Sequence, residues 1–387
     1  MIEIKNHVIF FIAFLAIFLN IHSDQVLADN SLRIEITRIT NDSDSTTKIN
    51  PEIYDNIIIW EIRDEGGSVD VSGLYYIDLT DRSLHKLVHY TGHYYITRST
   101  IYKDKIVWNE WNSYPGPVYL YNITTERKEE LDLGGLIFGI SGMYEEKIVG
   151  VTVNNTTGYD IYLYNLTTGE EVPICTDPGD QQAPLIWGDY VVWLDIPSRG
   201  NIYGYDLTTQ EKFLISPAGA ECRYKDMYGD YVLLDCDGYG NYYIYNLRLK
   251  RIEWKLPEFY SKRGTYTDWT SLWGDYVLGV TVVGYAYPSK PSYLFNLSSG
   301  EVYKMNVSLP MRNDMYGNRI VYLMPETDDI YLLEFNISNE TPPPPPPPPT
   351  PPPPEKKPQV DITLPVTAIA LMVVVGLAFL YNGLRRG

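Results

Sequence analysis

The sequence predicts an all-β fold, a seven-bladed β-propeller of four-stranded blades, and three observations support this prediction. The chain of 387 residues is 44% hydrophobic and 21% charged, which is enough apolar material for a large core. It holds 35 tyrosines and 8 tryptophans against 10 phenylalanines, a composition typical of strands with amphipathic aromatics. One hairpin pattern also recurs seven times at intervals of about 40 to 48 residues, the spacing of propeller blades.

The chain begins with a segment typical of an export signal. Lys5 precedes an apolar run from Val8 to Ile21, and 26–28 offers residues that a signal peptidase can cleave after. The alternative is an uncleaved membrane anchor, but a run of about 14 residues is short for a span of about 20. We therefore predict a signal peptide at 1–28.

A strand without a local partner follows the predicted signal peptide. Leu32 to Ile39 alternates apolar and polar residues, with Leu32, Ile34 and Ile36 on one face. The seventh repeat unit ends near Asn336 and has no fourth strand of its own. Because an unpaired strand is prone to aggregate, we predict that the N-terminal strand docks on the outside of the seventh blade and closes the ring.

Each copy of the repeated pattern begins with an aromatic residue, passes through a turn containing an acidic residue or Asn, and ends in a β-branched run. The copies are Tyr54–Trp60, Tyr102–Trp108, Tyr144–Gly150, Trp187–Trp193, Tyr228–Leu234, Trp273–Gly279 and Tyr316–Tyr322. A strand with a polar turn follows each copy, as at 161–165, and a further run such as 212–215 comes after it. With the short run before the turn, each unit has four strands, and we place the propeller at 29–341.

The alternation of tyrosine with aliphatic residues gives every strand two partly apolar faces. Such a sheet must be covered on both sides, which the radial stacking of blades achieves. We interpret the tyrosines as packing between blades, and the alternative is a platform on which carbohydrate stacks.

The C-terminal region predicts a stalk and an anchor. Residues 342–361 are proline-rich and favour an extended polyproline II conformation. Residues 362–383 form a predicted transmembrane helix, and 384–387, with Arg385 and Arg386, a cytoplasmic tail. Positive residues stay on the cytoplasmic side, so we predict a single-pass protein of the cell membrane with an extracellular propeller.

The hairpin at 160–169, Asp-Ile-Tyr-Leu-Tyr-Asn-Leu-Thr-Thr-Gly, resembles the repeats of TolB-like propellers and is similar to those of archaeal cell-surface proteins. The resemblance covers most of 48–335 and implies a binding or scaffolding role. TolB itself would imply an additional N-terminal domain, which we do not find in this sequence, and an anchor takes its place.

Composition and motifs narrow the predicted function. A net charge of −18 argues against sequence-independent nucleic-acid binding, which needs a basic surface. The sequence has no G-x-S-x-G motif and no paired carboxylates that stand out from the repeat, so we predict no catalytic residue, no cofactor and no metal site. The predicted function is a membrane-anchored binding or scaffold module of the cell envelope, whose partner is an envelope or surface-layer protein or glycan. The alternatives are a carbohydrate-active enzyme, either glycosidase or polysaccharide lyase, on a propeller face, and a structural element of a surface layer.

Modification sites complete the sequence predictions. Nine sequons predict N-glycosylation at Asn41, Asn122, Asn154, Asn155, Asn165, Asn296, Asn306, Asn336 and Asn339, although the repeated turn itself can generate several of them. Cys222 and Cys236 flank the turn of the fifth repeat and are a candidate disulfide, which leaves Cys175 as a buried thiol. We read His85, His89 and His93 as part of an outer strand and its loop rather than as a metal site, and 235–241 as a hairpin turn rather than a calcium loop.

Overall fold

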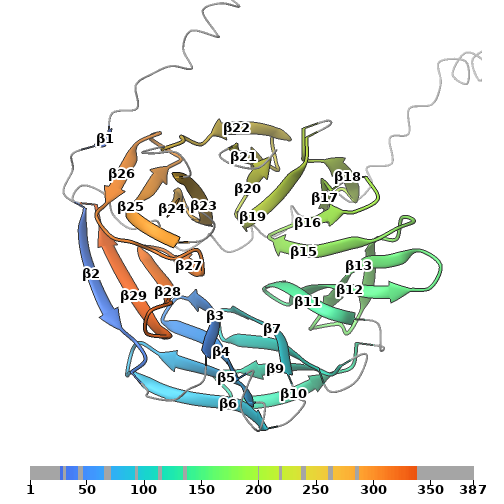
Figure 1. The fold of residues 1–387 in the computed structure, drawn as a ribbon. Helices are drawn as coiled ribbons and strands as arrows, with labels where there is room; N and C mark the ends of the chain where they lie inside the picture. Colours follow the sequence, from blue (N-terminus) through green and yellow to red (C-terminus); the bar gives the residue numbers. More distant parts are fainter. Residues whose placement is uncertain are drawn as a thin grey trace, which may run out of the picture. The chain divides into compact units, whose positions relative to one another are not determined.

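The computed structural model describes residues 27–28 and 32–337, apart from short gaps at 42–46, 65–70, 92–94, 112–115, 134–136, 199, 218–219, 237–240, 260–264 and 284–286. Seven sheets lie around a common centre, as Figure 1 shows. The predicted all-β fold, a seven-bladed propeller of four-stranded blades, is therefore confirmed. The described residues include no helix long and apolar enough to cross a membrane.

Every blade uses its strands in the same order from the centre outward. The innermost strands are β3 (Thr47–Tyr54), β7 (Tyr95–Tyr102), β11 (Ile137–Tyr144), β15 (Gln181–Trp187), β19 (Cys222–Tyr228), β23 (Thr265–Trp273) and β27 (Asn313–Tyr316). The second strands are β4 (Ile57–Asp64), β8 (Lys105–Trp111), β12 (Lys147–Asn154), β16 (Tyr190–Asp195), β20 (Tyr231–Cys236), β24 (Tyr276–Val283) and β28 (Arg319–Met324). The third strands are β5 (Val71–Asp78), β9 (Val118–Asn122), β13 (Gly158–Asn165), β17 (Asn201–Asp206), β21 (Tyr242–Asn246), β25 (Tyr287–Asn296) and β29 (Asp329–Asn336). The outermost strands are β6 (Ser83–Thr91), β10 (Arg127–Leu131), β14 (Glu171–Cys175), β18 (Glu211–Leu214), β22 (Arg251–Lys255), β26 (Val302–Met305) and, for the last blade, β2 (Arg33–Arg38).

The turn between the first two strands explains the repeated sequence pattern. The residue after the leading aromatic has a φ between 50° and 60° in all seven blades, as at Asp55 and Gly229. This is the left-handed region, which glycine adopts at least cost. Glycine stands there in four blades and Asp, Lys or Glu in three, so those three turns carry some backbone strain.

The core fills the space within and between the blades. Trp108 and Trp193, which end two copies of the pattern, are fully buried. Each packs against a tyrosine of the third strand in its own blade, with ring centroids 5.6 Å apart for Trp108–Tyr119 and 6.1 Å for Trp193–Tyr203. Many of the tyrosines thus pack against tryptophan on the blade faces, in agreement with the packing interpretation.

The N-terminal strand closes the ring as predicted. β2 pairs antiparallel with β29 from Arg33↔Asn336 to Arg38↔Tyr331. The expected inward face is only partly correct, because Leu32 and Ile34 are half-buried but Ile36 is 47% exposed. A polar cluster at the end of the strand adds the missing contacts, and it is described below.

The regions predicted at both ends lie largely outside the described residues. These are most of the signal peptide at 1–28, the stalk at 342–361, the transmembrane helix at 362–383 and the tail at 384–387. The two exceptions are Leu27 and Ala28, which form β1 and pair in parallel with Val302 and Tyr303 of β26.

Candidate active site in the central channel

A channel of about 600 Å³ lies where the seven innermost strands meet. Every one of these strands contributes residues to its wall. The strands run in the same sense around the centre, so residues at the same offset from the leading aromatic lie at similar depth (Figure 1). The residues of the channel wall can therefore be grouped into layers according to their offset from the leading aromatic.

The leading aromatics form the floor of the channel. Neighbouring rings have centroids between 4.1 and 5.1 Å apart, and the contacts form a complete circle through Tyr54, Tyr102, Tyr144, Trp187, Tyr228, Trp273 and Tyr316. Alternate members also touch, with Trp187 and Trp273 at 5.6 Å. An open flat circle would hold alternate members much further apart, so the rings fill their own centre and close this end.

A layer with three carboxyl groups lies directly above the floor. Glu52, Asp226 and Asp314 each stand two residues before the floor aromatic of their own strand. Residues two apart on a strand share a face, so these carboxyls point into the channel like the aromatics below them. The remaining blades place a hydroxyl or a small or apolar residue at this level, including Thr100 and Ser271.

The depth of this layer changes the acidity of all three groups. Burial, followed by repulsion from Asp314, raises the pKa of Glu52 to about 8. The same two causes raise the pKa of Asp226 to about 7. Burial raises the pKa of Asp314 to about 6 against the opposing effect of backbone hydrogen bonds. At neutral pH the layer therefore contains a protonated Glu52 beside an ionised Asp314.

Hydrogen bonds separate the roles of the three carboxyls. Asp226 accepts from the backbone N–H of Leu272 at 2.7 Å and Asp314 from that of Ile53 at 2.8 Å, so each links its blade to the next. Both aspartates are therefore held in place by hydrogen bonds between neighbouring blades. Glu52 accepts no backbone hydrogen bond in the described structure, and its carboxyl interacts with the Thr100 hydroxyl. Glu52 is the carboxyl best placed to exchange protons with a ligand.

Backbone irregularities help to aim side chains into the channel. Six innermost strands shift register near the carboxyl layer, for example between Tyr224 and Asp226 in β19 and between Ile96 and Arg98 in β7. Such β-bulges re-aim side chains and are common beside active sites. Here they accompany a cationic layer nearer the mouth that consists of Arg98, Lys225 and Arg312.

Sequence reasoning missed all six charged residues of the channel. No linear motif joins them, because they come from blades 1, 2, 5 and 7. The available signal was the leading aromatic, since counting back two residues in each copy finds the three carboxyls. That step requires knowing that the aromatics meet at the centre.

The predicted glycosylation sites differ in exposure. Asn41, Asn154, Asn155, Asn306 and Asn336 are exposed, Asn122 and Asn165 are half-buried, and Asn339 lies outside the described residues. Asn296 is only 3% exposed, and its side-chain oxygen accepts from the N–H groups of Ser298 and Ser299 at 2.8 and 2.9 Å. Asp206 makes the same turn contacts with Thr208 and Thr209, so turn geometry alone accounts for an Asn at this position.

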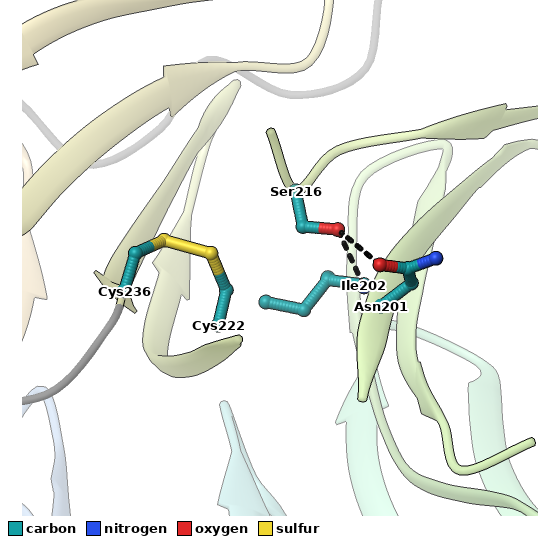
Figure 2. Close-up of a disulfide and its surroundings, with 5 residues drawn as sticks. All are labelled: Asn201, Ile202, Ser216, Cys222 and Cys236. Carbon is teal, nitrogen blue, oxygen red and sulfur yellow. Dashed lines mark hydrogen bonds between the residues drawn. A yellow bond between two sulfur atoms is a disulfide. The ribbon is translucent and has the colours of Figure 1, made fainter. Parts of the chain in front are cut away.

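The cysteines lie in the third and fifth of the sheets that follow β2. Cys222 and Cys236 are direct partners across β19 and β20, and their Sγ atoms are joined in a disulfide (Figure 2). The disulfide links the two strands at the end away from the aromatic floor, and Ser216 lies nearby, where its Oγ accepts from the Ile202 N–H at 3.1 Å. Cys175 of β14 is a buried free thiol.

His85 and His89 lie on the outer strand β6, away from the residues that line the channel. His85 stacks on Tyr76 with centroids 4.4 Å apart, and His89 is exposed on the same outer strand, β6. His93 and residues 237–240 lie outside the described residues. Among the residues that are described, no group of three or more His, Cys, Asp or Glu is arranged to hold a metal ion.

Comparison with known proteins shows that the chain is similar in fold to several solved structures. No protein-family model matches the chain, and no curated protein matches its sequence at a significant level. An acylaminoacyl peptidase of Pyrococcus horikoshii matches with a TM-score of 0.53 and 13% identity over 72% of this chain and 49% of that one, so the chain spans about half the length of the peptidase. The β-propeller domain of the Trilobed protease from Pyrococcus furiosus matches with a TM-score of 0.53 and 13% identity over 72% of this chain and 91% of that domain. An oligogalacturonate lyase from Vibrio parahaemolyticus matches with a TM-score of 0.51 and 11% identity over 79% of this chain and 98% of the lyase.

These similarities correct the predicted function. The sequence predicted a non-catalytic binding or scaffold module, but several of the matching propellers belong to enzymes, a peptidase and a lyase among them. At these identities the similarities themselves show the fold, a seven-bladed β-propeller.

Proposed function

We propose that the central channel is the active site of a carbohydrate-active enzyme that cleaves glycosidic bonds by acid–base chemistry. The observation that carries this proposal is the pair Glu52 and Asp314, whose pKa values of about 8 and about 6 lie on either side of neutral pH. Two carboxyls with separated pKa values are the arrangement that glycosidic bond cleavage requires.

The two carboxyls take complementary roles. Protonated Glu52 donates its proton to the glycosidic oxygen, which leaves as a hydroxyl group. In hydrolysis, the Asp314 carboxylate accepts a proton from the water that attacks the anomeric carbon. In a lyase, a carboxylate would instead accept a proton from the sugar carbon beside the breaking bond. The chain of the lyase relative is matched over 98% of its length, which supports a carbohydrate substrate over a peptide.

The test is turnover by Glu52→Gln against a panel of neutral and acidic polysaccharides. We expect the substitution to lower the rate about 10²- to 10⁴-fold, because it removes the proton donor. Glu170→Gln, at an exposed turn between β13 and β14, is the matched control and should keep full activity. A substrate whose leaving group has a low pKa needs less help from a proton donor. Glu52→Gln should therefore cleave such a substrate with a smaller loss of rate. Absence of turnover on every polysaccharide, or full activity of Glu52→Gln, would contradict the proposal.

We further propose that the propeller is a TolB-like module displayed on the outer side of the cell membrane. The support comes from the sequence: the export-signal pattern at 1–28, the uncharged run at 362–381 and the sequons. Accessibility of the propeller to protease on intact cells is the measurement that checks this orientation.

A further inference from the structure

The mouth side of the channel carries positive charge in a strongly acidic protein. Arg98 and Arg312 stand four residues before their floor aromatics, and Lys225 stands three before. They come from three different blades and all line the channel. Arg98 and Arg312 are exposed, and the Lys225 side chain is half-buried. Their position is one level nearer the mouth than the carboxyl layer, so an entering ligand meets these cations first.

Lys225 and the two arginines differ in their ion pairs within the described residues. Lys225 pairs with Asp268 at 3.1 Å and with Asp235 at 3.9 Å. No ion pair links Arg98 or Arg312 to a carboxylate within the described part of the chain. Arg98 does act on Glu52, but that carboxyl is protonated at neutral pH. Two guanidinium groups that form no ion pair with a carboxylate among the described residues are conspicuous in a chain with 49 acidic and 31 basic residues.

Guanidinium groups have a preferred partner. Their planar N–H groups match the two oxygens of a carboxylate and bind it with strong charge-assisted hydrogen bonds. The arginines are therefore placed to bind an anionic group of a ligand whose sugar ring lies lower, beside Glu52.

The aromatic floor limits which part of a polymer can enter the channel. The aromatic rings close the far end of the channel, so a chain cannot thread through it. The volume of about 600 Å³ lies within the range of about 300–1,000 Å³ found for small-molecule sites. The channel can hold the end of an oligosaccharide and has no exit for a continuing chain.

We infer that the channel accepts the end of a carboxylate-bearing oligosaccharide, with Arg98 and Arg312 binding the carboxylate. This inference rests on the proposed carbohydrate activity and adds to it the charge of the substrate and the exo mode of attack. Removal of sugars from chain ends follows from the closed floor, and preference for acidic sugars follows from the arginines.

Binding of defined sugars to the full chain in detergent tests the inference without requiring turnover. The probes for calorimetry are trigalacturonate, its methyl ester and maltotriose, in the Glu52→Gln background. Trigalacturonate should bind about tenfold or more tightly than its ester, because the ester keeps the sugar and loses the charge. Arg98→Gln and Arg312→Gln should each weaken trigalacturonate about tenfold and leave the ester unchanged.

Matched variants separate recognition from folding. Arg127→Gln, on the exposed outer strand β10, should bind trigalacturonate as well as the parent does. Arg98→Lys should recover part of the affinity, because it restores the charge without the planar fork. Equal binding of acid and ester, or an unchanged preference in both arginine variants, would overturn the inference even if the protein cleaves polysaccharides.

Chain length tests the exo mode separately. Polygalacturonate supplied at the same total uronate concentration has far fewer ends, so it should occupy far fewer channels than the trimer. Equal binding per uronate residue would overturn end recognition. A retained preference for the acid with no turnover on any sugar would instead contradict the proposed enzyme and leave the recognition of the carboxylate standing.

Discussion

At the scale of single residues, the properties of Glu52 arise from its position in the ring rather than from its neighbours in sequence. Its strand, β3, ends at Tyr54, so the carboxyl lies just above the aromatic floor. Burial there, together with Asp314 from the last blade, raises its pKa to about 8. Glu170, by contrast, lies at an exposed turn outside the channel. The residue that carries the proposed chemistry could not be distinguished from the other acidic residues until the blades were brought together.

The rate of sugar cleavage should depend on pH as a bell-shaped curve. Activity needs Glu52 protonated, so it should fall as the pH rises through about 8. It also needs Asp314 ionised, so it should fall as the pH drops through about 6. The maximum rate therefore lies near neutral pH. The two apparent pKa values of the curve describe Glu52 and Asp314 as a coupled pair. Measured kcat/KM across this range checks the prediction, and a rate that does not change between acid and alkaline pH would contradict it.

At the scale of elements, ring closure depends on one buried carboxylate as well as on strand pairing. Asp329, at the start of β29, is 1% exposed and forms an ion pair with Arg38 at the end of β2. It accepts a hydrogen bond from the Thr40 hydroxyl at 2.8 Å, and the buried Lys48 amine lies 3.9 Å away at the start of β3. Asp329 thus connects the N-terminal segment to the last blade and to the first.

The sequence predicted this closure but attributed it to different contacts. Alternation in Leu32–Ile39 identified the strand, and the missing fourth strand of the last unit identified its place. Alternation cannot show how deep an edge strand lies, and Ile36 remains 47% exposed because no further layer covers the outermost strand. The compensating contacts join residues about 290 positions apart, which no local pattern reveals.

Replacing Asp329 should open the ring. Asp329→Asn removes a buried carboxylate that faces two cations, which should cost about 3–5 kcal/mol of unfolding free energy. Limited proteolysis should then release the N-terminal strand before the rest of the propeller is cut. Asp189→Asn is the matched control, because its ion pair with Lys147 at 3.5 Å is largely exposed and should contribute at most about 1 kcal/mol. Equal protease resistance in both variants would show that β2 is held by its backbone pairing alone.

At the scale of the whole molecule, the repeat pattern was enough to predict the fold, and the channel was not predictable from it. Seven copies at a regular interval specify seven blades, because each copy supplies one hairpin that needs neighbours on both faces. The leading aromatic of each copy is visible in the sequence as the residue that precedes the turn. Only a closed ring brings Tyr54 and Tyr316, from opposite ends of the propeller, to 4.8 Å from each other. The residues of the channel meet only when the ring of blades closes, so a pattern read along the sequence could not reveal the site.

The aromatic floor should therefore contribute to the stability of the whole propeller as well as to the shape of the site. Trp187 contacts rings from four other blades, those of Tyr102, Tyr144, Tyr228 and Trp273, at centroid distances between 4.5 and 6.1 Å. Trp187→Ala should remove these contacts at once and lower the unfolding free energy by about 3 kcal/mol or more.

The matched control for the floor is Trp254→Ala. Trp254 is also half-buried, but it lies on the outer strand β22 and contacts the Phe295 ring at 5.3 Å. Its removal should cost clearly less, since it joins only two blades. Urea denaturation followed by circular dichroism measures both losses, and a common melting transition for all blades is expected because the floor joins them. If Trp187→Ala costs no more than Trp254→Ala, the floor serves to close the channel and adds little to the cohesion of the ring.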